Sequence, residues 1–309
     1  MPAKMKMKHH LASRTGLFFG AGACLFLALH PASAQGAPAQ DPATHSPAPQ
    51  QEAAPGGALV PHRAVYELTL GGTGAGFNVS DIRGNLFYDF RGSACEGYTL
   101  NTRLITEVSD RDGKATTHDV QTESREDAEG KHFRFSTAES TNGKPEDITK
   151  GSAKRAARHP EILYVYLEKP KKASFALSGN ILFPTQHSLR LLKAALAGQT
   201  RLQADIYDGS EKGAKVYEST SVIGPPLELS ANAQLRAIEN TQLLDGIPSW
   251  PVIVSYYDRD TKKDRLPSYE ISFRMYANGV SRKLKLDYGA FSLDGELSSI
   301  EFLKSKPCP

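Results

Sequence analysis

Cysteine is the residue type with the widest choice of chemistry in this sequence, and it occurs three times, as Cys24, Cys95 and Cys308. A cysteine can act as a nucleophile, exchange disulfides or pair permanently with a second cysteine, and its neighbours and compartment decide which. No two of the three lie in a C-x-x-C motif, so the sequence does not indicate a thiol–disulfide catalyst. What the cysteines do therefore depends on where the protein is located.

The first 34 residues are typical of a secretory signal peptide. Basic residues precede an apolar run at 17–29, and the small residues Ala32 and Ala34 form a cleavage site. The apolar run is about 13 residues long, shorter than the roughly 20 that span a bilayer, which argues against an uncleaved anchor. A lipoprotein would need Cys24 at the cleavage point, but the apolar run continues past it. We predict that residues 1–34 are a signal peptide and that the protein is exported from the cytoplasm without Cys24.

Removing this segment also removes the basic charge of the chain. The whole sequence has 37 Lys and Arg against 34 Asp and Glu, a formal net charge of +3. Residues 1–34 hold four of the basic residues and none of the acidic ones, so the exported chain has a net charge of about −1. A nucleic-acid partner is therefore not expected.

Export leaves Cys95 and Cys308 in an oxidising compartment, where two cysteines allow one pairing. We predict a disulfide between them, with two free thiols as the alternative. The bond would close a loop of roughly 200 residues, and the loop-closure model gives about 5 kcal/mol for this constraint on the unfolded chain. It would also hold the last residues of the sequence, since chain ends otherwise tend to be poorly ordered.

No motif predicts a catalytic, metal or cofactor site. The Gly-rich segment 71–77 has Phe77 where a dinucleotide-binding loop needs glycine, and we interpret it as a turn. The pair Asp110 and Asp112, whose pattern recurs at 258–260, begins like a calcium loop but lacks the later oxygen ligands, and we favour turn chemistry, which explains it without a metal. The histidines outside the signal peptide show no metal-binding spacing.

Two further features could take part in binding. Lysines and arginines cluster at 150–172, which suits an anionic partner, a lipid surface or simply a solvated face. The single tryptophan, Trp250, precedes a strand-like run whose Tyr256 and Tyr257 should point to opposite faces. We interpret Trp250 as core packing first and as the wall of a ligand-binding cleft second.

The elements that position these residues are mostly strands. Residues 35–57 are rich in Pro, Ala and Gln and predict a disordered tether. From residue 58 onward, short segments of alternating polarity are separated by turn residues, including Asn278-Gly279, a strong hairpin signal. No strand–helix–strand alternation is evident. The sequence therefore predicts one all-β domain over 58–309, built on a many-stranded antiparallel sheet.

One segment, at about 185–198, has the spacing of an amphipathic helix. Leucines recur at helical intervals, Thr185 is a candidate N-cap and Gly198 a candidate C-terminal stop. Such a helix usually covers the open face of a curved sheet. The alternative, an interfacial membrane helix, is less favoured because few of its residues are basic and none is aromatic.

A resemblance to a known family rests on several stretches: RAVYELTL, FPTQHSLRLLKAALAGQT, YDGSEKGAKVY, SWPVIVSYYD and most of the sequence from LPSYEISFRMYANGVSRKL onward. These resemble the EipB family, the cell-envelope-integrity proteins of Gram-negative alphaproteobacteria. The resemblance implies a periplasmic, non-enzymatic protein whose strands coil into an open spiral or barrel-like form with one associated helix. The family's cysteine pair corresponds to Cys95 and Cys308, and the resemblance transfers no catalytic residue.

The sequence as a whole thus predicts a periplasmic, non-enzymatic protein that supports envelope integrity as a structural or binding protein. It predicts no cofactor and no transmembrane segment after signal cleavage, and envelope proteins or envelope components as partners. Two alternatives remain: a carrier of lipid or another apolar ligand, and an envelope hydrolase whose site assembles from distant residues.

Overall fold

The computed structural model describes residues 58–74, 77–227, 244–259, 266–304 and 308. The predicted signal peptide, the predicted tether and Asp260 lie outside the described residues. Every described strand belongs to one 15-stranded sheet, and the prediction of an all-β fold is confirmed.

The first half of the sheet consists of long strands joined mostly by tight turns. Its strands are β1 His62–Thr73, β2 Val79–Ser93, β3 Gly97–Asp110, β4 Ala115–Glu126, β5 His132–Thr141, β6 Lys144–Arg155, β7 Ile162–Lys169 and β8 Ala173–Ser178. Each of β1–β7 pairs antiparallel with the strand that follows it in sequence.

The second half contains the helix and the remaining strands. Its elements are β9 Ile181–Leu182, α1 Pro184–Leu196, β10 Arg201–Ile206, the 3₁₀ turn η1 Glu211–Gly213, β11 Tyr217–Ile223, β12 Ser249–Asp258, β13 Tyr269–Tyr276, β14 Ser281–Asp287 and β15 Phe291–Phe302. The last strand, β15, pairs with the first, β1, so the strands that begin and end the described sheet lie side by side in its middle.

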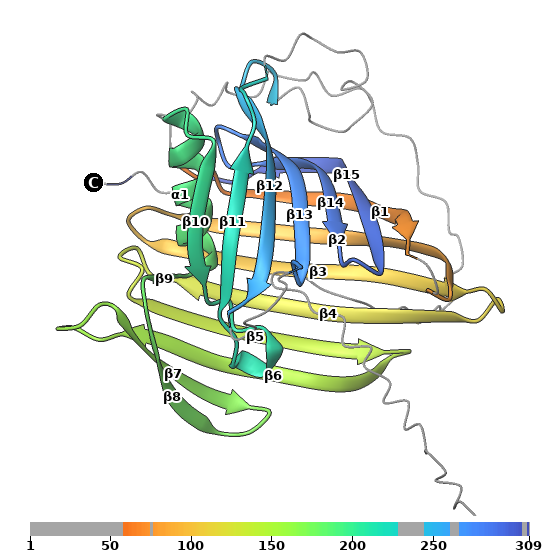
Figure 1. Cartoon of the computed structure of the whole chain (residues 1–309), viewed down its shortest axis with the longest axis horizontal. Coiled ribbons are helices and arrows are strands. Elements are labelled where there is room, and N and C mark those ends of the chain that lie inside the picture. Colours follow the sequence, from red (N-terminus) through yellow and green to blue (C-terminus); the bar gives the residue numbers. More distant parts are fainter. Residues whose placement is uncertain (1–57, 75–76, 228–243, 260–265, 305–307, 309) are drawn as a thin grey trace, which may run out of the picture.

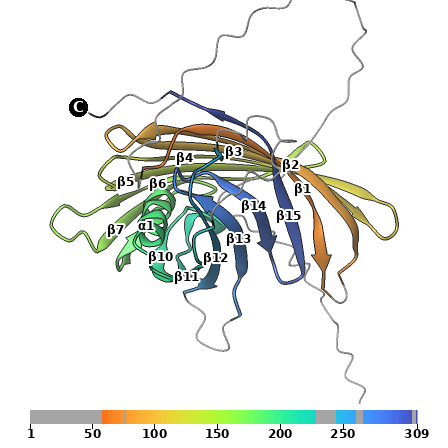
Figure 2. The same ribbon diagram turned by 90° about the horizontal axis from the view of Figure 1, so that it is seen from above.

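This strand order leaves one seam. The edge strands are β8 and β9, which are consecutive in the chain. The sheet coils until it is nearly closed into a barrel. Figure 1 shows β10–β13 standing across the long strands β3–β6, and Figure 2 shows α1 under those long strands and beside β10. The predicted coiled form with one associated helix is therefore confirmed.

Alternating polarity decides which side chains face the inside of the coil. In β1, His62, Ala64, Tyr66 and Leu68 are buried. The register places Phe90, Tyr88 and Leu86 of β2 opposite the first three of these, and the same face continues into β3. Because a strand has a period of two, these side chains all point to the inner face.

One detail of the topology differs from expectation. Strands β9 and β10 pair in parallel, with α1 as their crossover connection, so the sheet is mixed and not wholly antiparallel. The sequence pattern missed this unit because β9 is two residues long and both are buried, which leaves no alternation to detect.

The start of α1 also differs from expectation. The helix begins at Pro184 with Phe183 as its N-cap, so the prediction of Thr185 as N-cap is wrong. Instead, the carboxylate of Glu126, at the end of β4, accepts the N–H groups of Thr185 at 2.5 Å and Gln186 at 3.2 Å. The carboxylate of Glu126, which is distant in sequence, thus satisfies the N–H groups at the helix start. The sequence predicts the hydroxyl of Thr185 for this capping. At the other end, Gly198 has φ +69° just past the helix, as predicted.

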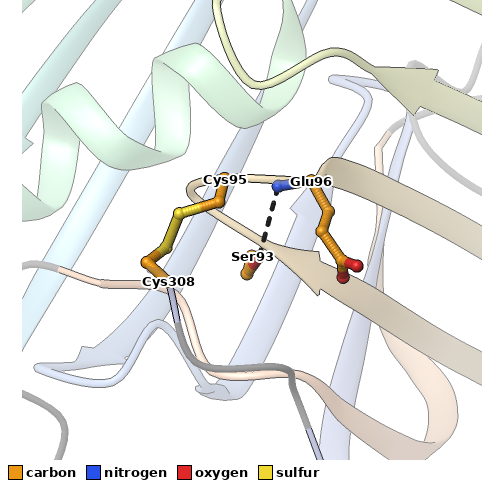
Figure 3. Close-up of a disulfide and its surroundings, with 4 residues drawn as sticks. All are labelled: Ser93, Cys95, Glu96 and Cys308. Carbon is orange, nitrogen blue, oxygen red and sulfur yellow. Dashed lines mark hydrogen bonds between the residues drawn. A yellow bond between two sulfur atoms is a disulfide. The ribbon is translucent and has the colours of Figure 1, made fainter.

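Cys95 and Cys308 are joined by a disulfide (Figure 3). Cys95 lies in the turn between β2 and β3, where the N–H of Glu96 donates to Ser93 Oγ at 3.3 Å, and Cys308 follows β15. Their Cα atoms are 5.7 Å apart, within the ordinary range for a disulfide, although 213 residues separate them in sequence. The pairing is the one that the cysteine count predicts.

Candidate ligand-binding cavity

The inside of the coil contains an apolar cavity with two adjoining parts. The helix part, about 210 Å³, lies between α1, β2 and strands β12 and β13. The sheet part, about 170 Å³, lies between β1–β3 and strands β13 and β14. The two parts share His62, Tyr88, Ile271 and Phe273 in their walls. Together they fall near the lower end of the volumes of small-molecule sites, roughly 300–1,000 Å³.

The walls of the cavity come from alternate residues of strands that lie far apart in sequence. Ile271 and Phe273 of β13 face Tyr88 of β2 across the interior, and Leu191 of α1 closes the helix part. Each is apolar or aromatic, and each lies on the inner face by the period of two in a strand or by the buried stripe of the helix. The coil therefore brings residues from both ends of the domain into one site.

His62 forms a polar but uncharged section of this wall. Its ring stacks on Tyr88 at 5.3 Å, and its Nδ1–H donates to the carbonyl of Val60 at 2.7 Å. Burial lowers the pKa of His62, so the neutral form is favoured. With Nδ1 protonated, Nε2 is the acceptor of this imidazole.

His187, on the buried face of α1, lines the helix part. Burial, with a smaller contribution from Arg190, lowers the pKa of His187 to about 4. Its Nε2 has no hydrogen-bond partner among the described residues. In the sheet part, Thr102 Oγ1 of β3 is likewise buried and unpartnered within the described part of the chain.

Tyrosines and one carboxyl border the helix part on its other side. Tyr256 and Tyr269 stack at 4.4 Å, and Tyr217 packs edge-on against Tyr269 at 5.6 Å. Asp208 lies beside them, and its Oδ1 accepts the N–H of Ser210 at 2.9 Å. Burial raises the pKa of Asp208 and, more strongly, that of Tyr269. These groups therefore favour their neutral forms more than exposed ones would.

Trp250, Tyr256 and Tyr257, the three aromatic residues considered in the sequence as core or cleft residues, lie in three different environments. Trp250 is 6% exposed and packs in a core cluster with Leu191 and Leu192 of α1, and it does not line the cavity. Tyr256 lines the helix part. Tyr257, on the other face of β12, lines an outer hollow instead.

Two larger hollows lie on the outer surface. One, about 530 Å³, is bordered by Tyr257, Glu218 and Arg190, and the other, about 510 Å³, by Arg63, Asp89 and further charged or polar side chains. Both are open to solvent, and their charged groups include paired ones, such as Arg63 with Asp89 at 2.9 Å. The interior cavity is the better candidate because a site of this kind is enclosed and mostly apolar.

The remaining candidates from the sequence have structural explanations. Asp110 Oδ1 accepts the N–H groups of Asp112 and Lys114 at 3.0 and 2.8 Å, which makes a turn between β3 and β4.

The basic cluster at 150–172 is divided between surface ion pairs and buried contacts. Lys150 pairs with Glu168 at 2.7 Å, whereas Arg155 is half-buried and donates to the carbonyl of Ile181. Among the described residues, no three His, Cys, Asp or Glu side chains gather as metal ligands would.

Sequence reasoning missed the two cavity histidines, although signals for both were present. His62 is in phase with Tyr66 and Leu68 in β1, and His187 lies four residues before Leu191 in α1. Both patterns predict an inward-facing side chain. What the sequence could not show is that the two faces meet around one cavity.

The coiled, nearly closed sheet and its apolar interior place this chain in the class of barrel-like all-β proteins. Its family is shown by sequence: the EipB-like family model matches residues 53–304, and the chain belongs to that family. It is 36% identical over 246 residues to the cell envelope integrity protein EipB of Brucella abortus (strain 2308), covering 79% of this chain and 84% of that protein.

A crystal structure gives the same fold. A β-barrel-like protein from Brucella abortus, described as a domain of unknown function, superposes with a TM-score of 0.74 at 34% sequence identity. The match covers 80% of this chain and 99% of that one. The resemblance to the EipB family seen in the sequence is therefore confirmed, and with it a place among cell envelope integrity proteins. No helix in the described parts of the chain is long and apolar enough to cross a membrane.

Proposed function

We propose that this protein supports envelope integrity from the periplasm as a non-enzymatic binding protein that holds an apolar ligand inside its coiled sheet. The observation that carries the proposal is the interior cavity, whose walls are mostly apolar and aromatic. The seam between β8 and β9 leaves the coil unclosed, unlike a sealed barrel. The predicted signal peptide and the disulfide both fit an oxidising compartment outside the cytoplasm.

Stacking of the side chains around the cavity supports a binding site that is formed before the ligand binds. The largest side chains around the cavity are fixed by stacking, as in the Tyr256–Tyr269 and His62–Tyr88 pairs. A cavity with fixed walls loses little conformational entropy when a ligand enters, which favours binding over a purely structural role.

The test is to fill the cavity. Ile271 lines both parts, so Ile271→Trp should occupy the space and reduce the lipid that co-purifies with the exported protein by about tenfold, a loss of roughly 1.4 kcal/mol in binding. Ile253→Trp is the matched control, because Ile253 is on the outer face of the neighbouring β12 and is 45% exposed. Lipid is measured by mass spectrometry of solvent extracts, and thermal melting shows that each variant folds.

The same variants connect binding with the role in the envelope. In a strain lacking the gene, detergent and cell-wall-antibiotic resistance should be restored by the wild type and by Ile253→Trp. It should not be restored by Ile271→Trp or by a form without residues 1–34. If the wild-type protein is consistently empty of lipid, or if folded Ile271→Trp restores resistance fully, the binding role is refuted and a structural role stands in its place.

A further inference from the structure

We propose that the ligand of the interior cavity is a single-chain apolar molecule that is uncharged and has hydroxyl or amide groups, and not a fatty acid or a phospholipid. The inference rests on the proposed function, since it names the chemistry of the molecule held there. It comes from three features of the walls: their charge, their unpartnered polar atoms and their shape.

The walls, as far as the structure describes them, offer no charge to an anionic head group. No Lys or Arg of the described residues lines either part. Among the described lining residues, Asp208 is the one with a carboxyl group, which would repel an anion whenever it is ionised. The buried Arg282 follows Ser281 in the chain but lines neither part. Burying a carboxylate or phosphate without a cation costs several kcal/mol, so these head groups are disfavoured.

The walls do offer neutral hydrogen bonds. His187 Nε2 in the helix part and Thr102 Oγ1 in the sheet part are buried and have no partner within the described residues. A buried polar atom left unpaired costs free energy, and a ligand group that pairs with it recovers that energy. A neutral imidazole nitrogen and a hydroxyl are best matched by a hydroxyl or amide, since these can both donate and accept.

The low pKa of His187 supports the same conclusion. With a value of about 4, this imidazole is neutral near pH 7 and does not attract an anion as an imidazolium would. Thr185 and Asp208 line the same part of the cavity as His187, and Arg190 on its own helix opposes its protonation.

The shape limits the ligand to one chain. The helix part and the sheet part, about 210 and 170 Å³, adjoin at walls that they share, which include the rings of His62, Tyr88 and Phe273. An apolar chain would lie against these rings with a polar group at one or both ends, near His187 and Thr102. The combined volume is small for the two chains of a phospholipid, because it falls near the lower limit of drug-sized sites.

The experiment is a displacement titration of the exported protein with its disulfide intact. N-phenyl-1-naphthylamine, a neutral apolar dye, is bound first and then displaced at pH 7.5 by four compounds of equal chain length: dodecanol, dodecanamide, dodecanoate and dodecyl phosphate. The alcohol and the amide are expected to displace the dye at concentrations about tenfold lower than the two anions, which corresponds to roughly 1.4 kcal/mol.

Two variants locate the effect. His187→Leu keeps the apolar volume and should weaken dodecanol about fivefold more than it weakens the dye, whereas His159→Leu, at an exposed histidine, should change neither. If His187→Leu does not fold, Thr102→Val serves as the second variant. Its control is Thr99→Val on the opposite face of the same strand β3.

The outcomes separate the two proposals. Equal or stronger displacement by the anions, or no effect of either His187→Leu or Thr102→Val on dodecanol, overturns the inference and leaves the binding function in place. Absence of dye binding, or absence of its displacement by all four compounds, overturns the proposed function and the inference with it.

Discussion

At the scale of single residues, the inner face is notable for polar side chains whose charge is suppressed by burial. Glu126 is 2% exposed, and burial raises the pKa of its carboxyl to about 7, although the N–H groups of Thr185 and Gln186 oppose the shift. His187, on the helix that Glu126 caps, shows the same effect in the opposite direction. Burial therefore shifts the pKa of both groups in the direction that favours the neutral form, and of the two only His187 lines the cavity.

Glu126 makes a pH prediction with a definite sign. Between its unfolded pKa near 4.5 and its folded pKa near 7, the folded state holds a proton that the unfolded state has lost. Stability contributed by this proton is full below the unfolded pKa, and it declines as the pH rises through the folded one. The free energy of unfolding of the wild type should therefore fall, relative to that of Glu126→Gln, by roughly 3 kcal/mol from pH 4.5 to 7.5.

Urea unfolding of both proteins across this range measures the difference. Glu129→Gln, at an exposed carboxylate three residues along, should follow the wild-type profile. Parallel profiles for the wild type and Glu126→Gln would show that folding does not raise the pKa of Glu126.

At the scale of elements, α1 covers the inner face of the coiled sheet and so encloses its interior. Its buried stripe, including Leu191 and Leu192, packs in one cluster with Trp250 of β12 and Phe90 of β2. The helix thus contacts both halves of the sheet across the coil. This agrees with a helix that covers the sheet, as the sequence predicts, and it places the basic residues Arg190 and Lys193 on the exposed side.

Two leucines of α1 test this packing within one helix. Leu192→Ala should lower the free energy of unfolding by about 2–5 kcal/mol, because Leu192 is fully buried and its removal leaves a cavity. Leu196→Ala, at a leucine that is 43% exposed, should change it by less than about 1 kcal/mol. Chemical denaturation gives both values. Similar losses in the two variants would mean that the helix is not anchored through its inner stripe.

At the scale of the whole molecule, the disulfide links the two halves of the sheet next to its central pair of strands. Cys95 belongs to the β2–β3 turn and Cys308 follows β15, and β1 lies between β2 and β15 in the sheet. The bond closes a loop of 213 residues. Loops of this length gain the most from a crosslink in the chain-entropy model, at about 5 kcal/mol.

Breaking the bond should therefore destabilise the whole domain. Cys308→Ser should lower the melting temperature by about 10–20 °C in oxidising buffer, because about 5 kcal/mol of stabilisation is lost and each kcal/mol corresponds to roughly 2–4 °C for a domain of this size. Cys95→Ser should lower it equally, and under reducing conditions both variants should melt with the wild type. Calorimetry in the two buffers makes the comparison, and equal melting of variant and wild type in oxidising buffer would contradict it.

The sequence by itself determined the elements that depend on local periodicity: the alternating strands, the Asn278-Gly279 hairpin, the Gly198 helix end and the single allowed cysteine pairing. Each of these predictions follows from neighbouring residues or from the number of cysteines, so it does not require knowledge of contacts between residues distant in sequence. The two wrong predictions both depend on contacts with residues that are distant in sequence. Thr185 is not the N-cap, and Glu126 instead accepts hydrogen bonds from the start of the helix. The sheet is not wholly antiparallel, because the two-residue strand β9 pairs in parallel with β10. Only the tertiary structure decided the cavity. His62, Thr102 and His187 are individually unremarkable in the sequence, and they line one space because the sheet coils and brings separate inner faces together.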